Sequence, residues 1–200
     1  MTHRLLLTCF AIALISAFAS APLLAEDGAR TVTVAPDSTI KWVGAKVTGD
    51  HEGGFKDFVG KVTLDAQGDL EKVAFEVQTG SVYSDNGILT RHLRGDDFFA
   101  VKEFPTSTFV STSIRKGLDP VFAQSGKAVG ATHTIIGKLT LRGVTKLIKF
   151  PVTVTQSKGA MRASAEFVID RYSFGIKYDG FKNNLIRREV ILKVDLTIPA

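Results

Sequence analysis

The feature that most constrains this chain is an apolar side chain at every second position, repeated over many short stretches. Val190, Leu192, Val194, Leu196 and Ile198 form the longest such series, with mostly polar residues between them. This period of two is typical of β-strands that bury one face. It is also present in segments 61–65, 73–78, 148–154 and 165–169.

Further strand candidates lie at 31–35, 39–48, 107–115 and 132–142, and turn-forming residues separate many of these segments. Gly143, Lys158-Gly159 and the stretch from Lys116 to Pro120 are examples. About eight to ten strands at hairpin-like spacing predict an all-β, antiparallel sandwich or barrel.

One segment interrupts this pattern. Residues 85–104 carry Ile88, Leu89 and Leu93 at helical spacing, and Asp85 or Asn86 is a suitable N-cap. We expect a short helix followed by an irregular crossing. A helix inserted between the strands of a barrel often closes one end, so the segment is predicted to act as a plug.

The N-terminus has the layout of a secretory signal peptide over residues 1–25. Arg4 supplies a basic start, the run 5–18 is uncharged and apolar, and small residues precede Glu26. A membrane-anchoring helix is the less favoured interpretation, because such helices need about 20 apolar residues. We expect cleavage after Ala25, with Ala19 as second choice, and an exported protein in the periplasm or outside the cell.

Cleavage would remove Cys9, the only cysteine of the chain, and thiol catalysis with it. The sequence contains no G-x-S-x-G elbow and no G-x-x-x-x-G-K phosphate loop. His51, His92 and His133 are spread widely, so a histidine-dependent metal hydrolase is a minor alternative. The prediction is a protein that is not an enzyme and uses no metal and no cofactor.

The excess of basic residues does not indicate nucleic-acid binding. The formal charge of +5 falls to +4 after cleavage, and basic residues alternate with acidic ones along the chain. The densest cluster, Lys138, Arg142, Lys146 and Lys149, is spread over two predicted strands and is interpreted as a solvated face. We therefore expect no nucleic-acid partner.

Phenylalanine is the compositional feature with a functional implication, because 12 of the 14 remain after cleavage. They can fill an ordinary core, or they can line the hollow of an eight-stranded barrel, as in lipocalins. Such a hollow suits a long apolar ligand. The alternation alone does not distinguish a filled barrel from a hollow one.

Four short motifs resemble, in order, those of the YceI family of exported polyisoprenoid-binding proteins. They cover residues 54–65, 92–111, 137–146 and 170–175, and include Gly54-Phe55 with Phe58, His92-Leu93 with Asp97-Phe98, and Gly143-Val144-Thr145. The chain departs from the family pattern at Leu89-Thr90, where many members carry Arg-Asp, and at Gly95, where Ser is usual.

The resemblance implies an extended antiparallel eight-stranded β-barrel, lipocalin-like, over residues 26–200, plugged by segment 85–104. It also implies a channel for a long-chain lipid such as a polyisoprenoid (an isoprenoid quinone or a prenyl phosphate) or a fatty-acid derivative. No catalysis and no membrane span after cleavage are expected, and a homodimer is compatible with the family. The alternative is a periplasmic stress-response or interaction module without a lipid.

Two groups of residues are the site candidates that follow. Large apolar side chains near the expected barrel ends are predicted to line the cavity: Trp42, Phe55, Phe58, Phe98, Phe99 and Phe109. Three residues of the plug segment, Arg91, His92 and Arg94, are predicted to form a polar mouth through charge-assisted hydrogen bonds. For His92 the competing interpretation is structural, with the ring tying the helix to a strand carbonyl.

Overall fold

The structure is a computed structural model that describes residues 28–123, 128, 130–157, 159–182 and 184–199. The predicted signal peptide at 1–25 lies outside these residues and stays a prediction. No helix within the described ranges is both long and apolar enough to cross a membrane.

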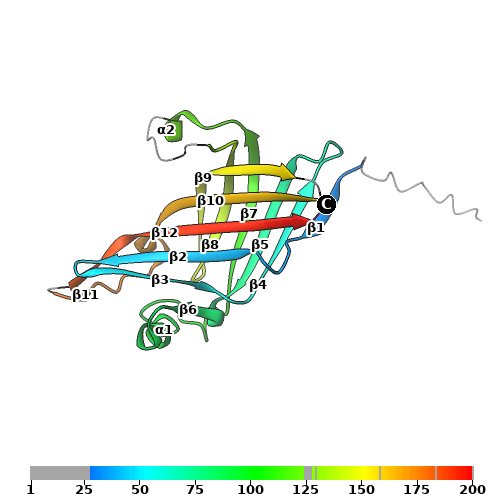
Figure 1. Ribbon diagram of the computed structural model, residues 1–200. Helices are drawn as coiled ribbons and strands as arrows, with labels where there is room; N and C mark the ends of the chain where they lie inside the picture. The colour runs from blue at the N-terminus through cyan, green and yellow to red at the C-terminus, as the bar shows by residue number, and fades with distance from the viewer. Residues whose placement is uncertain (1–27, 124–127, 129, 158, 183, 200) are drawn as a thin grey trace, which may run out of the picture.

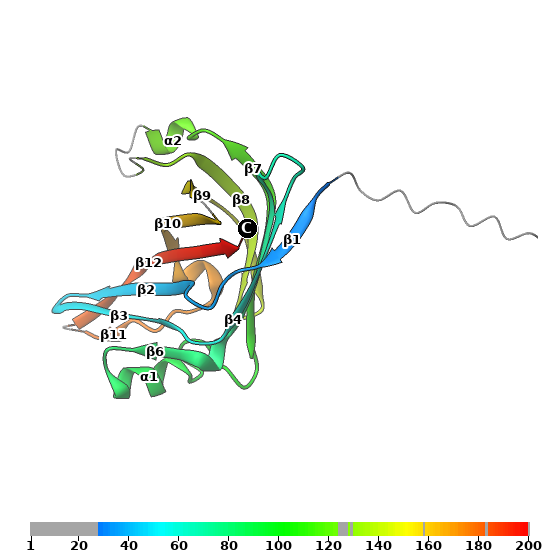
Figure 2. The same cartoon turned by 45° about the vertical axis from the view of Figure 1, so that its right-hand side comes forward.

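Twelve strands form one antiparallel sheet that curls around a hollow, as the two views in Figure 1 and Figure 2 show. In sheet order the strands are β1 (Arg30–Thr33), β4 (Phe58–Leu64), β5 (Leu70–Gln78), β7 (Thr106–Lys116), β8 (His133–Leu141), β9 (Val144–Ser157), β10 (Ala160–Asp170), β12 (Asn184–Pro199), β2 (Thr39–Lys46), β3 (Gly49–Phe55) and β6 (Val82–Ser84). The short β11 (Gly180–Phe181) pairs only with β12. The predicted all-β antiparallel fold is confirmed.

Two long, bent strands and the two short strands β1 and β11 account for the difference between twelve strands and the predicted eight. Only Lys56 and Asp57 separate β3 from β4, and only the 3₁₀ turn η1 (Thr79–Ser81) separates β5 from β6. Hydrogen bonds continue across the bend, from Lys56 N to the Ser81 carbonyl at 3.3 Å and from Gln78 N to the Asp57 carbonyl at 3.0 Å. When β3 with β4, and β5 with β6, are each counted as one strand, eight long strands remain besides β1 and β11. Because β4 and β5 lie near one end of the sheet order and β3 and β6 at the other, the two bent strands join the two ends of the curled sheet.

The alternation in the sequence determines which face of each strand is buried. On β10, Met161 and Ala163 are buried while Arg162 and Ser164 are exposed. Because side chains of a strand point alternately to its two faces, the apolar series all turn to the inside of the curl. The longest strand, β12, carries the series from Val190 to Ile198 that dominates the sequence.

The predicted helical interruption is present as α1 (Gly87–Leu93) and an irregular crossing after it. Asn86 is the N-cap, and its side chain accepts hydrogen bonds from Ile88 N at 2.9 Å and Leu89 N at 3.0 Å. Leu93 and Phe98 are buried against the sheet. The segment therefore covers one end of the curl, beside β6 (Figure 1).

Two smaller helical elements complete the fold. One is α2 (Pro120–Ala123), which lies between β7 and β8 in the chain and far from α1 (Figure 1). The other is the 3₁₀ turn η2 (Arg171–Phe174), capped by Asp170, whose carboxylate accepts from Tyr172 N at 2.9 Å. This cap makes β10 end at Asp170 and turns the chain across the same end of the sheet as α1.

The buried residues form two clusters rather than one. The first lies around Val62, Phe150 and Ile198, and the second around Trp42, Phe98 and Phe174, next to α1 and η2. Ile148 and Phe167 pack against both clusters. The space between and along them is the cavity described next.

Candidate functional site

The inside of the curled sheet is hollow. The cavity has a volume of about 320 Å³ and is lined by strands from both halves of the sheet and by the α1 segment. Its size falls in the range of small-molecule binding pockets. Six lining residues have polar side chains: Lys46, His51, Ser107, Thr108, Ser164 and Arg171. The rest of the wall is apolar apart from Gly44, so the cavity suits a hydrocarbon chain.

Strand register arranges the inward-facing residues of β10, β12, β2 and β3 in parallel rows. One row contains Phe167, Leu192, Trp42 and Gly53, each opposite the next. The next row, two residues along β12 in the direction of Ile198, contains Ala165, Val194, Ile40 and Phe55. On the other side of the Trp42 row, towards the turn between β2 and β3, the row contains Ile169, Val190, Gly44 and His51.

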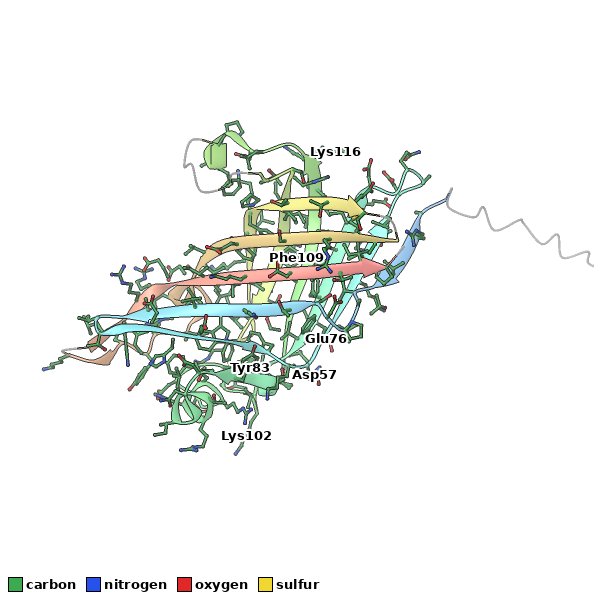
Figure 3. The ribbon with its side chains drawn as sticks, viewed as in Figure 1. Asp57, Glu76, Tyr83, Lys102, Phe109 and Lys116 are labelled. Carbon is green, nitrogen blue, oxygen red and sulfur yellow. The ribbon has the colours of Figure 1, made fainter. Side chains whose placement is uncertain are left out.

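Five of the six aromatic residues proposed from the sequence lie on the cavity wall: Trp42, Phe55, Phe98, Phe99 and Phe109. Phe55 and Phe99 meet edge to face with their ring centroids 5.6 Å apart, which joins β3 to the α1 segment. Phe109 lies in the middle of the molecule, between Tyr83 near α1 and Lys116 near the opposite end (Figure 3).

Phe58 is not among the lining residues. It packs against the first cluster, on the same face of β4 as Val62, with its ring centroid 6.3 Å from that of Phe75. Three other phenylalanines do line the cavity, namely Phe75, Phe150 and Phe167. The rings of Phe150 and Phe167 are stacked at 4.1 Å. Each of the three belongs to the alternating apolar series of its strand, and this series was the sequence signal that could have identified it.

Trp42 fits the wall because the neighbouring strand carries glycine. A Cβ atom on Gly53 would lie 2.6 Å from Cζ2 of Trp42 and 2.0 Å from the Tyr83 carbonyl oxygen, so no larger residue fits there. The indole Nε1 is buried, and no described residue accepts a hydrogen bond from it. Leaving a buried donor without an acceptor costs about 1–3 kcal/mol.

The three residues proposed for a polar mouth lie on the α1 segment but not on the cavity wall. Arg91 is exposed, and Arg94 donates from Nη2 to the Val82 carbonyl at 3.1 Å. His92 Nε2 is 2.8 Å from Asp97 Oδ2, and its ring contacts Phe98 and Tyr178 edge-on. The partner of His92 is thus a carboxylate of its own segment, and the head-group role of these three residues stays a prediction.

Arg171 is a wall residue that the sequence reasoning missed. The residue is only 4% exposed, and its guanidinium donates to three backbone carbonyls. The acceptors are Arg187 at 3.0 Å from Nε, Ile176 at 2.8 Å from Nη1 and Ile186 at 3.1 Å from Nη2. Burial lowers the pKa of Arg171, because desolvation disfavours the charged form, yet arginine stays protonated in proteins. Its position two residues after Ile169 was the available signal.

The three histidines of the body have separate partners. His51 Nδ1 is 2.9 Å from Asp85 Oδ1, and His133 Nδ1 is 2.8 Å from Thr132 Oγ1. Burial lowers the pKa of His133. Among the described residues, no group of three histidine, cysteine, aspartate or glutamate side chains is placed to hold a metal ion.

A comparison with models of protein families matches residues 32–198 to the YceI-like domain. The chain belongs to the YceI family. Curated relatives include UPF0312 proteins from Pseudomonas putida, 33% identical over 135 residues, and from Yersinia pestis, 37% identical over 103 residues. These alignments cover 64% and 51% of this YceI-family chain, and 65% and 45% of the relatives' own length.

Solved structures share the fold. BcnA of Burkholderia cenocepacia superposes with a TM-score of 0.69 at 24% identity, over 82% of this chain and 98% of that one. A polyisoprenoid-binding domain from Saccharophagus degradans gives 0.62 at 16% identity, over 85% and 98%. The Campylobacter jejuni YceI protein gives 0.55 at 22% identity, over 72% and 83%. The curled antiparallel sheet is therefore the fold of known YceI proteins.

Proposed function

We propose that the protein is a non-enzymatic carrier that binds one long-chain amphiphile inside the curled sheet. The observation that carries the proposal is the cavity itself, which is continuous, about 320 Å³ in volume and almost wholly apolar. The side chains around this hollow forgo contacts with one another that they would make in a filled core. A bound hydrocarbon chain would restore those contacts.

The ligand class is a polyisoprenoid or a fatty-acid derivative. The Saccharophagus degradans domain, which shares the fold, is described as polyisoprenoid-binding, and this supports the first class. Branched and aromatic side chains make up most of the wall, and Trp42, Phe55, Phe98, Phe99 and Phe109 are the proposed contact residues. Each methylene moved from water into such a wall contributes about 0.8 kcal/mol, so a long chain binds tightly without polar contacts.

Export to the periplasm belongs to the same proposal. A carrier that shields an apolar chain is useful in an aqueous compartment between membranes, and the N-terminal 25 residues have the layout of a signal peptide. Cell fractionation with intact-mass measurement tests this part. The expected species begins at Glu26, in the periplasmic fraction, and an uncleaved cytoplasmic chain would contradict it.

The main test is extraction of the purified protein with organic solvent, followed by mass spectrometry. One long-chain amphiphile per protein molecule is expected. If nothing is extracted and the stripped protein takes up neither geranylgeraniol nor oleyl alcohol nor their acidic counterparts, the carrier proposal fails. A protein partner that co-purifies in place of lipid would favour an interaction module instead.

A further inference from the structure

We propose that the end of the cavity formed by Lys46, His51 and Arg171 binds an anionic head group, a carboxylate or a phosphate. The tail then runs from this end, beside Trp42, towards the cluster around Val62 and Ile198. This inference rests on the proposed lipid-binding function and specifies the chemistry and the orientation of the ligand.

The strand register places all three basic wall residues together. His51 lies opposite Gly44, and Lys46 lies two residues beyond Gly44 on the same strand, opposite Ile186 of β12. Arg171 follows β10 at the same level and donates to the carbonyl of that same Ile186, at 3.1 Å. Lys46, His51 and Arg171 thus occupy the last two rows of inward positions, at the tip of the β2–β3 hairpin.

The charge of this end is not compensated from within the cavity, because no aspartate or glutamate is among the lining residues. Three acids lie nearby but outside the cavity lining. Asp85 interacts with His51, Asp170 pairs with Arg188, and Asp179 lies exposed on the segment after η2. No ion pair joins Arg171 or Lys46 to a described carboxylate. Asp170 and Asp179 act on Arg171 through space without a direct ion pair, and an anionic ligand would supply a counter-ion in direct contact.

Arg171 also has hydrogen-bonding capacity left for this role. Its guanidinium has five N–H groups, and three backbone carbonyls accept from it, so two N–H groups are left without a described acceptor. The carbonyls hold the group rigidly against the wall. A rigid fork of N–H groups matches the paired oxygens of a carboxylate or a phosphate.

Trp42 marks the boundary between the polar and apolar parts of the cavity. It lies one row further in than His51, and its buried Nε1 has no acceptor among the described residues. An oxygen near the head of an amphiphile would satisfy it. Beyond Trp42 the rows contain Ile40, Phe55 and Leu196, and the far end closes at Val62 and Ile198, which are 0% and 1% exposed.

The test measures binding of matched charged and neutral probes to the stripped protein. Oleate is paired with oleyl alcohol, and geranylgeranyl phosphate with geranylgeraniol, so that carboxylate and phosphate are distinguished at constant tail. We expect at least one acid to bind ten-fold or more tightly than its alcohol, since hydrogen bonds to charged groups exceed neutral ones. The preferred acid identifies the head group.

Variants locate the subsite. Lys46→Gln and His51→Gln should each weaken the binding of the acid several-fold more than the binding of the alcohol. Lys41→Gln is the matched control, because Lys41 is on the same strand, is exposed and does not line the cavity. Arg171→Met should abolish the preference, and if that variant does not fold, the Lys46 and His51 variants decide.

The outcomes separate the two proposals. Alcohols that bind as tightly as acids, or equal effects of Lys46→Gln and Lys41→Gln, would overturn the head-group subsite and leave the carrier function standing. If none of the four probes binds, both proposals fail.

Discussion

Arg171 donates from Nη2 to the carbonyl oxygen of Ile186 at 3.1 Å, so a buried guanidinium ties η2 to the neighbouring strand β12. The same carbonyl belongs to the residue that faces Lys46 across the sheet. One hydrogen bond therefore links the end of β10 to the register shift in the β12–β2 pairing between Ile186 and Val190. The guanidinium stabilises this bulge and at the same time brings a positive charge to the cavity wall.

Replacement of Arg171 by methionine should lower the free energy of unfolding by about 3 kcal/mol, because three backbone carbonyls lose their donor in a buried place. Urea unfolding followed by circular dichroism measures this. Arg188→Met is the control, since Arg188 is exposed and its solvent-screened ion pair with Asp170 should contribute much less to stability. Equal losses in the two variants would contradict the assigned role of Arg171.

Trp42 is the only tryptophan of the chain and lies on the cavity wall, so its fluorescence reports on the cavity directly. With 8% of its surface exposed, it should be quenched poorly by iodide in solution. A nitroxide-labelled fatty acid should quench it strongly, in a saturable manner and with one site per protein. Strong quenching by iodide together with none by the labelled lipid would place the ligand elsewhere.

A phenylalanine at Ala165 should fill the cavity and exclude the ligand. Ala165 faces inwards on β10 and lines the cavity, opposite Val194 and one row away from Phe167. The apolar wall can accept the ring, so Ala165→Phe is expected to fold with a stability change below about 1.5 kcal/mol and to lose extractable lipid. Glu166→Phe, one residue further on the exposed face, should keep its lipid. Normal lipid content in Ala165→Phe would show that the hollow is not the binding place.

Asp170 makes stability depend on pH in the acid range. The hydrogen bond from Arg188 holds the pKa of the Asp170 carboxyl below its ordinary value. The folded state therefore gains stability above the unfolded pKa, about 3.9, and loses this gain as the pH falls through the lower folded pKa.

The corresponding measurement is the unfolding free energy of the wild type and of Asp170→Asn as a function of pH. Asparagine still accepts from Tyr172 N, so the difference isolates the charge. The wild type should be more stable than Asp170→Asn at pH 6, and this difference in unfolding free energy should shrink below about pH 4. Arg188→Gln should remove the same pH dependence, and a difference that persists unchanged at pH 2 would contradict the assignment.

Much of the architecture could be predicted because each strand is coded locally. The alternation in 73–78, 165–169 and 190–198 predicts strands β5, β10 and β12, and Asn86 before Ile88 and Leu89 predicts the start of α1. The count of strands could not be predicted, since a bend at Lys56-Asp57 leaves the alternation on either side intact. Whether such a bend divides one strand into two depends on the curvature of the whole sheet.

The candidate site was predicted less completely than the fold. Large aromatic residues were natural choices for the wall, and five of the six lie on it, whereas Phe58 packs against Phe75 without lining the cavity. The charged wall residues were missed, because Lys46 and Arg171 look in the sequence like any other surface cation at the end of a strand. Register is what turns them inwards, and register is set by pairing between segments that are more than a hundred residues apart.

By itself the sequence determined the all-β fold, the face that each strand buries, the capped helical interruption and the family. These properties depend on side chains within a few residues of one another, or on motifs that can be compared directly. Only the tertiary structure decided that the aromatic residues surround a hollow and that its cations gather at one end. A cavity is what remains after distant strands have curled and paired, so its existence and its polarity are properties of the whole sheet.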